Sequence, residues 1–214
     1  MSPIVKERLS LIETVSLEKG AHKPGAGYCA IELASYVAGE PWSDKCVSPV
    51  IRAFVVSWND TLDDTDRQML KPYIPLVIGT KTTEADEETR AWLATDWLVH
   101  TFAPAWLDLA GLAESAATLR ALPNLTSTEL ATAALPTIRA AREKSDAAWA
   151  AARAAARDAA GDAARDSAWA AARAAADKAL APTVKALQAE ALLLLDRMVA
   201  VGRVPLIERE GEGR

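Results

Sequence analysis

Apolar residues recur at the three- and four-residue spacing of a helix along most of this 214-residue chain. Ser2 followed by Pro3 is a typical helix start, and Gly20 is the first strong stop after it. Signals of the same kinds predict further helices over residues 28–38, 48–58, 63–71, 83–123 with a restart at Pro104, 136–181 and 183–201. No segment shows the sustained alternation of apolar and polar residues that is typical of a strand. The pattern therefore predicts an all-α protein.

Capping residues define several of these boundaries. Ser48 before Pro49 repeats the helix start seen at the N-terminus. Thr83 precedes a first turn rich in acidic residues, which the helix macrodipole favours. The segment 126–129, Thr-Ser-Thr-Glu, is interpreted as a capping box. Residues 72–78 fit either a short helix or an extended apolar segment, because the two prolines in them both suit a first helical turn.

One motif occurs twice in the second half of the chain. Residues 146–156 read DAAWAAARAAA and residues 166–176 read DSAWAAARAAA. Alanine has the highest helix propensity, and Trp and Arg four residues apart can stack on one helix face. The repeat therefore predicts a long Ala-rich helix. Its two Trp–Arg pairs are either packing anchors or a partner-binding surface; they are Trp149 with Arg153 and Trp169 with Arg173.

The repeat leaves open whether this helix is continuous. Twenty residues turn an α-helix by about 200°, so a straight helix would point Trp149 and Trp169 to nearly opposite sides. A break at Gly161 would instead let both face one core. The continuous or gently kinked helix over residues 136–181 is the favoured interpretation, because no polar loop surrounds Gly161 and one glycine costs only about 1 kcal/mol in a helix.

These elements predict two domains and a tail. A compact helical N-terminal domain is expected over residues 1–123. An Ala/Trp/Arg-rich hairpin or arm is expected over residues 124–207, where an amphipathic C-terminal helix returns after the long Ala-rich helix and completes the core. The charged residues 208–214 are expected to form a flexible tail.

The composition restricts the class of protein. Half of the residues are hydrophobic and a quarter are charged, but 37 of the 46 alanines follow residue 100, so large apolar side chains are sparse there. The net charge of −5 argues against a nucleic-acid partner. We see no signal peptide and no apolar run long enough for a membrane helix. A soluble cytoplasmic protein with reduced cysteines and no membrane partner is expected.

Five residues with metal-ligating side chains lie close together in the N-terminal half: His22, Cys29, Glu32, Asp44 and Cys46. Zinc accepts thiolate, imidazole and carboxylate ligands, although the spacing matches no standard zinc signature. The alternative is a buried cysteine, a capping aspartate and a surface histidine. A thiol nucleophile, Cys29 with His22 as its base, is a third interpretation. No cofactor other than zinc is suggested.

Standard catalytic motifs are absent from the sequence. It contains no Walker loop, no dinucleotide fingerprint, no His-Glu-x-x-His and no Gly-x-Ser-x-Gly. His100 lies among Trp97, Phe102 and Trp106, and we interpret it as a packed helix residue and not as a catalytic base.

Part of the chain resembles a known group of proteins. Residues 27–44 read GYCAIELASYVAGEPWSD, residues 46–50 read CVSPV, and residues 70–75 read LKPYIP. Over about residues 20–80, these segments resemble an uncharacterised family of hypothetical proteins from actinobacteria and their bacteriophages. The resemblance carries no activity over. It implies that several residues belong to one unit: Cys29, Glu32, Trp42, Asp44 and Cys46.

Together these observations favour a non-catalytic helical interaction protein, of bacterial or phage origin, that binds a protein partner or itself. The residues expected to carry the binding are Trp149, Arg153, Trp169 and Arg173. The alternative is a metal-binding or thiol-dependent enzyme centred on Cys29, Glu32, Asp44 and Cys46.

Overall fold

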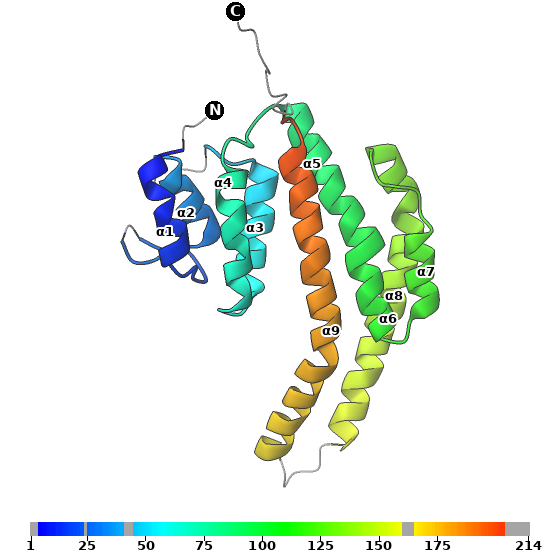
Figure 1. The fold of residues 1–214 in the computed structure, drawn as a ribbon. Helices are drawn as coiled ribbons and strands as arrows, with labels where there is room; N and C mark the ends of the chain where they lie inside the picture. The colour runs from blue at the N-terminus through cyan, green and yellow to red at the C-terminus, as the bar shows by residue number, and fades with distance from the viewer. Residues whose placement is uncertain (1–3, 24, 41–44, 160–164, 204–214) are drawn as a thin grey trace, which may run out of the picture. The chain divides into compact units, whose positions relative to one another are not determined.

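The computed structural model is helical, as predicted. It describes residues 4–23, 25–40, 45–159 and 165–203; of residues 154–159 and 165–174 it describes the backbone alone. Within these residues the elements are η1 (Lys6–Arg8), α1 (Ser10–Thr14), α2 (Ala30–Val37), α3 (Pro49–Thr61), η2 (Asp66–Tyr73), α4 (Ile74–Val77), α5 (Glu84–Trp97), η3 (Leu98–Phe102), α6 (Ala103–Leu109), α7 (Ala113–Arg120), α8 (Thr128–Ala159) and α9 (Arg165–Ala200) (Figure 1). The elements η1 and η2 are 3₁₀-helices and η3 is a π-helix. None of these helices is long and apolar enough to cross a membrane.

The chain packs as two compact units. Unit 1 comprises residues 1–91 and 195–214, and unit 2 comprises residues 92–194. Helices α5 and α9 each run from one unit into the other. The two units meet between residues 91 and 92 and between residues 194 and 195, whereas the predicted domain boundary is at residue 123. The predicted tail, residues 208–214, lies outside the described residues.

Helices α2 and α3 form the centre of unit 1. Leu33 and Val37 of α2 and Ile51 of α3 are fully buried. Helix α3 begins as predicted, because the Ser48 hydroxyl accepts a hydrogen bond from the backbone N–H of Ile51 at 3.2 Å, with a proline at the first helical position. The ambiguous segment 72–78 is helical up to Val77.

The predicted helix that ends at Gly20 is wrong beyond Thr14. Helix α1 stops there, and the next residue is extended. The chain that follows bonds to other parts of unit 1: the Leu17 N–H donates to the Gln68 side chain at 3.0 Å, and that side chain donates back to the Leu17 carbonyl at 3.1 Å. Leu17 is almost fully buried. Tertiary hydrogen bonds and burial thus outweigh the local helix signal.

Arg90 of α5 joins the C-terminal end of α9 to the rest of unit 1. Its side chain is fully buried. It donates to the backbone carbonyls of Met198 at 3.0 Å and Val201 at 2.7 Å, and it pairs with the Glu87 carboxylate at 2.7 Å. The last carbonyls of a helix have no partner within the helix, so this guanidinium acts as a C-terminal cap for α9. Glu87 in turn accepts a hydrogen bond from Ser48, the first residue before α3.

In unit 2, helix α6 begins at Ala103 with Pro104 in its first turn, close to the predicted restart, although the chain stays helical from α5 through η3 into α6. In the π-turn, the Ala103 N–H reaches back to the carbonyl of Leu98. Such a turn relieves the clash and the missing N–H that proline brings to a helix. The predicted continuation to residue 123 is wrong. Gly111, at φ +75°, allows the chain to turn between α6 and α7.

The predicted helix caps before α5 and α8 are largely correct. Thr83 and Asp86 exchange hydrogen bonds between backbone N–H and side chain, at 3.2 and 3.3 Å. Before α8, Ser127 accepts a hydrogen bond from the N–H of Leu130 at 3.3 Å. The cap is therefore Ser127, one residue after the first residue of the predicted capping box.

Two prolines predicted to begin helices lie inside them: Pro136 in α8 and Pro182 in α9. The predicted continuous helix over residues 136–181 is also wrong. Ile138 packs against the core around Leu107 of α6, and Leu187 lines a cleft with Ala105 of the same helix. One straight helix would separate residues 138 and 187 by about 70 Å, so the chain reverses between α8 and α9. Gly161 itself lies outside the described residues.

Replacing Arg90 tests its role as a cap. The Arg90→Met variant should lose about 3–5 kcal/mol of unfolding free energy, because two carbonyls and a half-buried carboxylate lose their partner. Urea denaturation followed by circular dichroism measures this loss.

The control is Arg120→Met, which removes the more exposed ion pair of 2.6 Å between Arg120 and Asp108. It should cost less than about 1 kcal/mol. Equal losses in the two variants would contradict the special role of Arg90.

Candidate functional site

Glu32 is the centre of a hydrogen-bond cluster in unit 1. Its carboxylate accepts from the ring Nδ1 of His22, from the backbone N–H of His22 and from the backbone N–H of Cys29, each at 2.8 Å. Glu32 occupies the third position of α2, and its contact with Cys29 is half of a capping box. The carboxylate therefore fastens the loop before α2 to the first turn of the helix.

A second carboxylate lies on the other side of the His22 ring. Nε2 of His22 is 3.5 Å from the Glu18 carboxylate. Gly27 allows this approach: its φ is +132°, and a Cβ atom there would lie only 2.8 Å from a Glu18 oxygen. The imidazole thus lies between two carboxylates. Both ring nitrogens of His22 therefore already face a partner.

Burial decides the ionisation of Cys29. Burial, the largest effect, raises the pKa of the Cys29 thiol to about 11, and the negative charge of Glu32 acts in the same direction. For Glu32, burial alone would raise the pKa, but the hydrogen bonds from His22 and Cys29 outweigh it and lower the pKa below its usual range. At neutral pH the site therefore holds a protonated thiol beside an ionised carboxylate. A protonated thiol is a poor nucleophile and a poor metal ligand.

The structure brings together three of the five residues predicted as metal ligands, namely His22, Cys29 and Glu32. Cys46 is buried, and its backbone carbonyl accepts a hydrogen bond from Gly79 at 2.7 Å. Asp44 lies outside the described residues. In the part of the chain that the structure describes, no three His, Cys, Asp or Glu residues are grouped as metal ligands. A zinc site that includes Asp44 stays a prediction.

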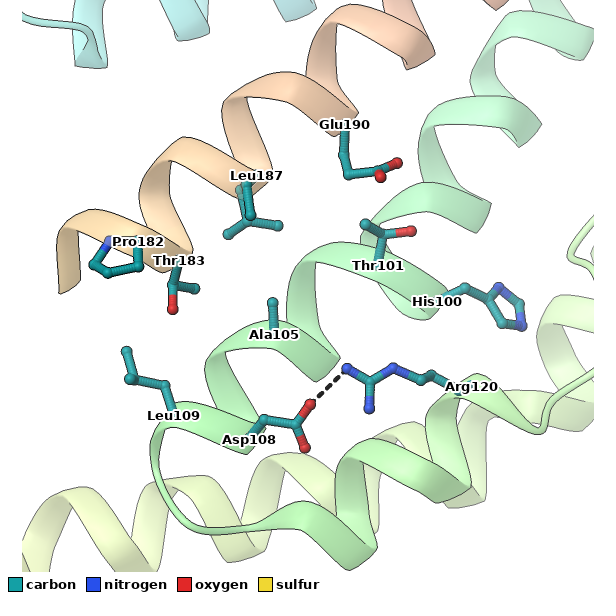
Figure 2. A pocket seen from close by; sticks show the side chains of 11 residues that line it. His100, Thr101, Ala105, Asp108, Leu109, Arg120, Pro182, Thr183, Leu187 and Glu190 are labelled. Carbon is teal, nitrogen blue, oxygen red and sulfur yellow. Dashed lines mark hydrogen bonds and ion pairs between the residues drawn. The ribbon is translucent and has the colours of Figure 1, made fainter. Parts of the chain in front are cut away.

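An open cleft of about 750 Å³ lies in unit 2 (Figure 2). Figure 2 shows Thr183, Leu187 and Glu190 of α9 on one side, and Thr101 and Ala105 on the other. The ion pair between Asp108 and Arg120 closes one end at 2.6 Å. The lining therefore offers hydroxyls, carboxylates and apolar surface for binding.

His100 lies in the π-turn beside this cleft, and π-turns are frequent at functional sites. Its Nδ1 is 3.0 Å from the Asp96 carboxylate, and its Nε2 is 2.9 Å from the Leu122 carbonyl. The ring points away from α9 in Figure 2. Both nitrogens thus fix the chain around the π-turn, in agreement with the interpretation of His100 as a packed residue.

The Trp149 side chain is the most exposed large hydrophobic side chain among the described residues, at 65%. The guanidinium carbon of Arg153 lies 5.6 Å from the centre of the indole, so the predicted stacking is present. Residues 149–153 of α8 are all exposed. We call these five residues the α8 docking surface. The side chains of Trp169 and Arg173 lie outside the described residues.

An apolar pocket of about 280 Å³ lies near this surface in unit 2. Its lining comes from Phe102 at the end of η3, from α6 and α7, and from Ile138, Ala141, Arg142 and Ser145 of α8. The sequence pattern did not predict this pocket. The only local signal was the spacing of Ile138, Arg142 and Ser145, which continues to Trp149.

The Glu32 cluster makes a prediction about pH. Because the pKa of Glu32 is lowered in the folded protein, its stabilising effect is present above the pKa of the unfolded chain and is lost as the pH falls through the folded value. The Glu32→Gln variant should lose about 1–3 kcal/mol of unfolding free energy at neutral pH. The difference from the wild type should shrink below about pH 4. Urea denaturation at a series of pH values measures it, with the exposed Glu13→Gln as control.

The raised pKa of Cys29 predicts a slow thiol. Alkylation by iodoacetamide at neutral pH, read by peptide mass spectrometry, should be about 100-fold slower than for a free cysteine with a pKa of about 8.5. The rate should keep rising with pH beyond pH 9, as the thiolate forms. Rapid labelling at neutral pH, or labelling that added zinc suppresses, would instead support the thiol or metal interpretation.

Comparison with known proteins yields no relative. No family model matches the chain, and neither a curated protein nor a solved structure matches it. The function is therefore proposed from the geometry of the chain itself.

Proposed function

We propose that this chain is a non-catalytic interaction protein that binds a protein surface through the α8 docking surface. The observation that carries the proposal is the Trp149 side chain, which is 65% exposed. Burying the exposed part of a tryptophan removes roughly 100–160 Å² from water, which stabilises a complex by about 2–4 kcal/mol. Tryptophan and arginine are also the residue types that most often dominate binding energy at interfaces.

The neighbours of Trp149 support docking. The residues between it and Arg153 are alanines, so no large side chain shields the indole from an approaching surface. The stacked Arg153 restricts the orientation of the ring before binding. A side chain that is ordered in advance loses less entropy in the complex.

The alternative, a metal-binding or thiol-dependent enzyme, has less support. Cys29 is a protonated thiol at neutral pH, and His22 is held between carboxylates. We also propose a cytoplasmic location, because neither Cys29 nor Cys46 forms a disulfide, as is usual in a reducing compartment.

Truncating the indole tests the proposal. The Trp149→Ala variant should weaken association by about 30- to 700-fold, which corresponds to the loss of 2–4 kcal/mol. Sedimentation velocity over a wide range of concentrations measures self-association. Affinity capture from bacterial lysate, quantified by mass spectrometry, measures binding to another protein.

The matched control is Leu193→Ala, which removes another exposed hydrophobic side chain of unit 2, 55% exposed. It should leave association unchanged. The proposal fails if the wild type neither self-associates nor captures a protein, or if Trp149→Ala behaves like the wild type in both assays.

A further inference from the structure

Trp149 and the apolar pocket lie along the same face of α8. Ile138, Arg142, Ser145 and Trp149 are separated by four, three and four residues, a spacing that aligns side chains on one side of a helix. The first three line the pocket together with Phe102 and Trp106. Trp149 follows one turn after Ser145 and is exposed. An apolar pocket and an exposed indole therefore adjoin on one helix face.

The pocket suits an aromatic ring. An apolar cavity of about 150 Å³ is large enough to take up benzene, so the 280 Å³ found here can receive the two rings of an indole. Phe102 is 37% exposed, and it packs edge-to-face against Trp106 with their ring centres 6.2 Å apart. The two rings offer an incoming ring the same kind of contact. The Arg142 side chain is 81% exposed and forms an exposed ion pair with Asp146 at 3.7 Å, so its guanidinium can stack on that ring at little cost.

An antiparallel pair of α8 helices would place each indole at the pocket of the other copy. If a two-fold axis passes between residues 145 and 146, Trp149 of one copy lies level with Arg142 of the second, because the two residues are equally far from the axis. The same axis creates the identical contact on the other side. Two equal contacts around one axis give a closed dimer, which is the commonest symmetric assembly.

We infer that the α8 docking surface binds a second copy of this chain, and that Trp149 of each copy fills the apolar pocket of the other. The inference rests on the proposed function and names its partner.

The charges on α8 agree with this arrangement. Within one copy, Arg142 and Asp146 are paired at 3.7 Å. Beside the two-fold axis, Asp146 of one copy lies only about 5 Å along the helix from Arg142 of the other, within reach of an arginine side chain. Arg142 of each copy can thus pair with Asp146 of the other copy in place of its own Asp146. The alanines on either side of Trp149 do not obstruct the approach of the two helices.

Cross-linking of the full chain tests the position and direction of the helices. A disulfide requires Cα atoms within about 7 Å of each other. In the Asp146→Cys variant the new thiols flank the axis, so mild oxidation should give a covalent dimer. In the control variant Arg139→Cys the thiols lie about 20 Å apart along the helices and should give none. The two native cysteines are buried and contribute little background.

Filling the pocket tests the receptor side. Ser145→Phe places a ring in the pocket and should weaken the dimer by at least about 30-fold in sedimentation velocity, as the loss of Trp149 does. The matched control, Ala140→Phe, adds the same ring at an exposed position on another face of α8 and should have no effect. Circular dichroism melting confirms that each variant remains folded.

The outcomes separate the inference from the proposed function. The inference is overturned if Arg139→Cys cross-links as readily as Asp146→Cys, or if Ser145→Phe dimerises like the wild type. It is also overturned, while the proposed function stands, if the wild type remains a monomer but captures a different protein through Trp149. If no association depends on Trp149, both fail.

Discussion

The buried guanidinium of Arg90 is the interaction on which the rest of the structure depends. A charge removed from water is costly unless it is paired and its hydrogen bonds are made. Here it is paired with Glu87 and donates to the Thr82 hydroxyl. It also donates to the carbonyls of Met198 and Val201 at the end of α9. Because those carbonyls occupy defined positions, Arg90 fixes where α9 stops in unit 1. Met198, fully buried, depends on that position.

Local signals predicted the parts of the fold that local interactions stabilise. Ser48 and Thr83 begin helices because a side chain bonds to the backbone three residues on, and both residues are visible in the sequence. The predicted N-terminal helix extended too far, because the Leu17 backbone bonds to the side chain of Gln68, fifty-one residues away. The predicted helix start at Pro136 was wrong because a helix of 32 residues can tolerate the cost of one proline, about 3 kcal/mol. In both cases the outcome depends on interactions beyond the neighbouring residues, which the local sequence signals do not include.

The candidate sites also combine features that local sequence predicts with features that only the folded chain defines. Helical spacing was sufficient to place Arg153 over Trp149, and nearness along the chain was sufficient to group His22, Cys29 and Glu32. The ionisation of Cys29 depends on burial, which only the folded chain defines. The apolar pocket was missed because its walls come from segments that are distant in sequence and meet only when α6, α7 and α8 pack.

The two helices that run between the units give unit 2 the topology of an inserted domain. The chain leaves unit 1 after Ala91 and returns at Leu195, and the Arg90–Met198 hydrogen bond of 3.0 Å holds these two points together. Everything from residue 92 to 194 is therefore one loop with clamped ends, and the entropy of closing a loop grows only with the logarithm of its length. Further copies of the Ala-rich repeat within this loop would therefore add little to the entropic cost of closing it. The number of repeats in unit 2 can thus vary while the two clamped ends of the loop stay the same.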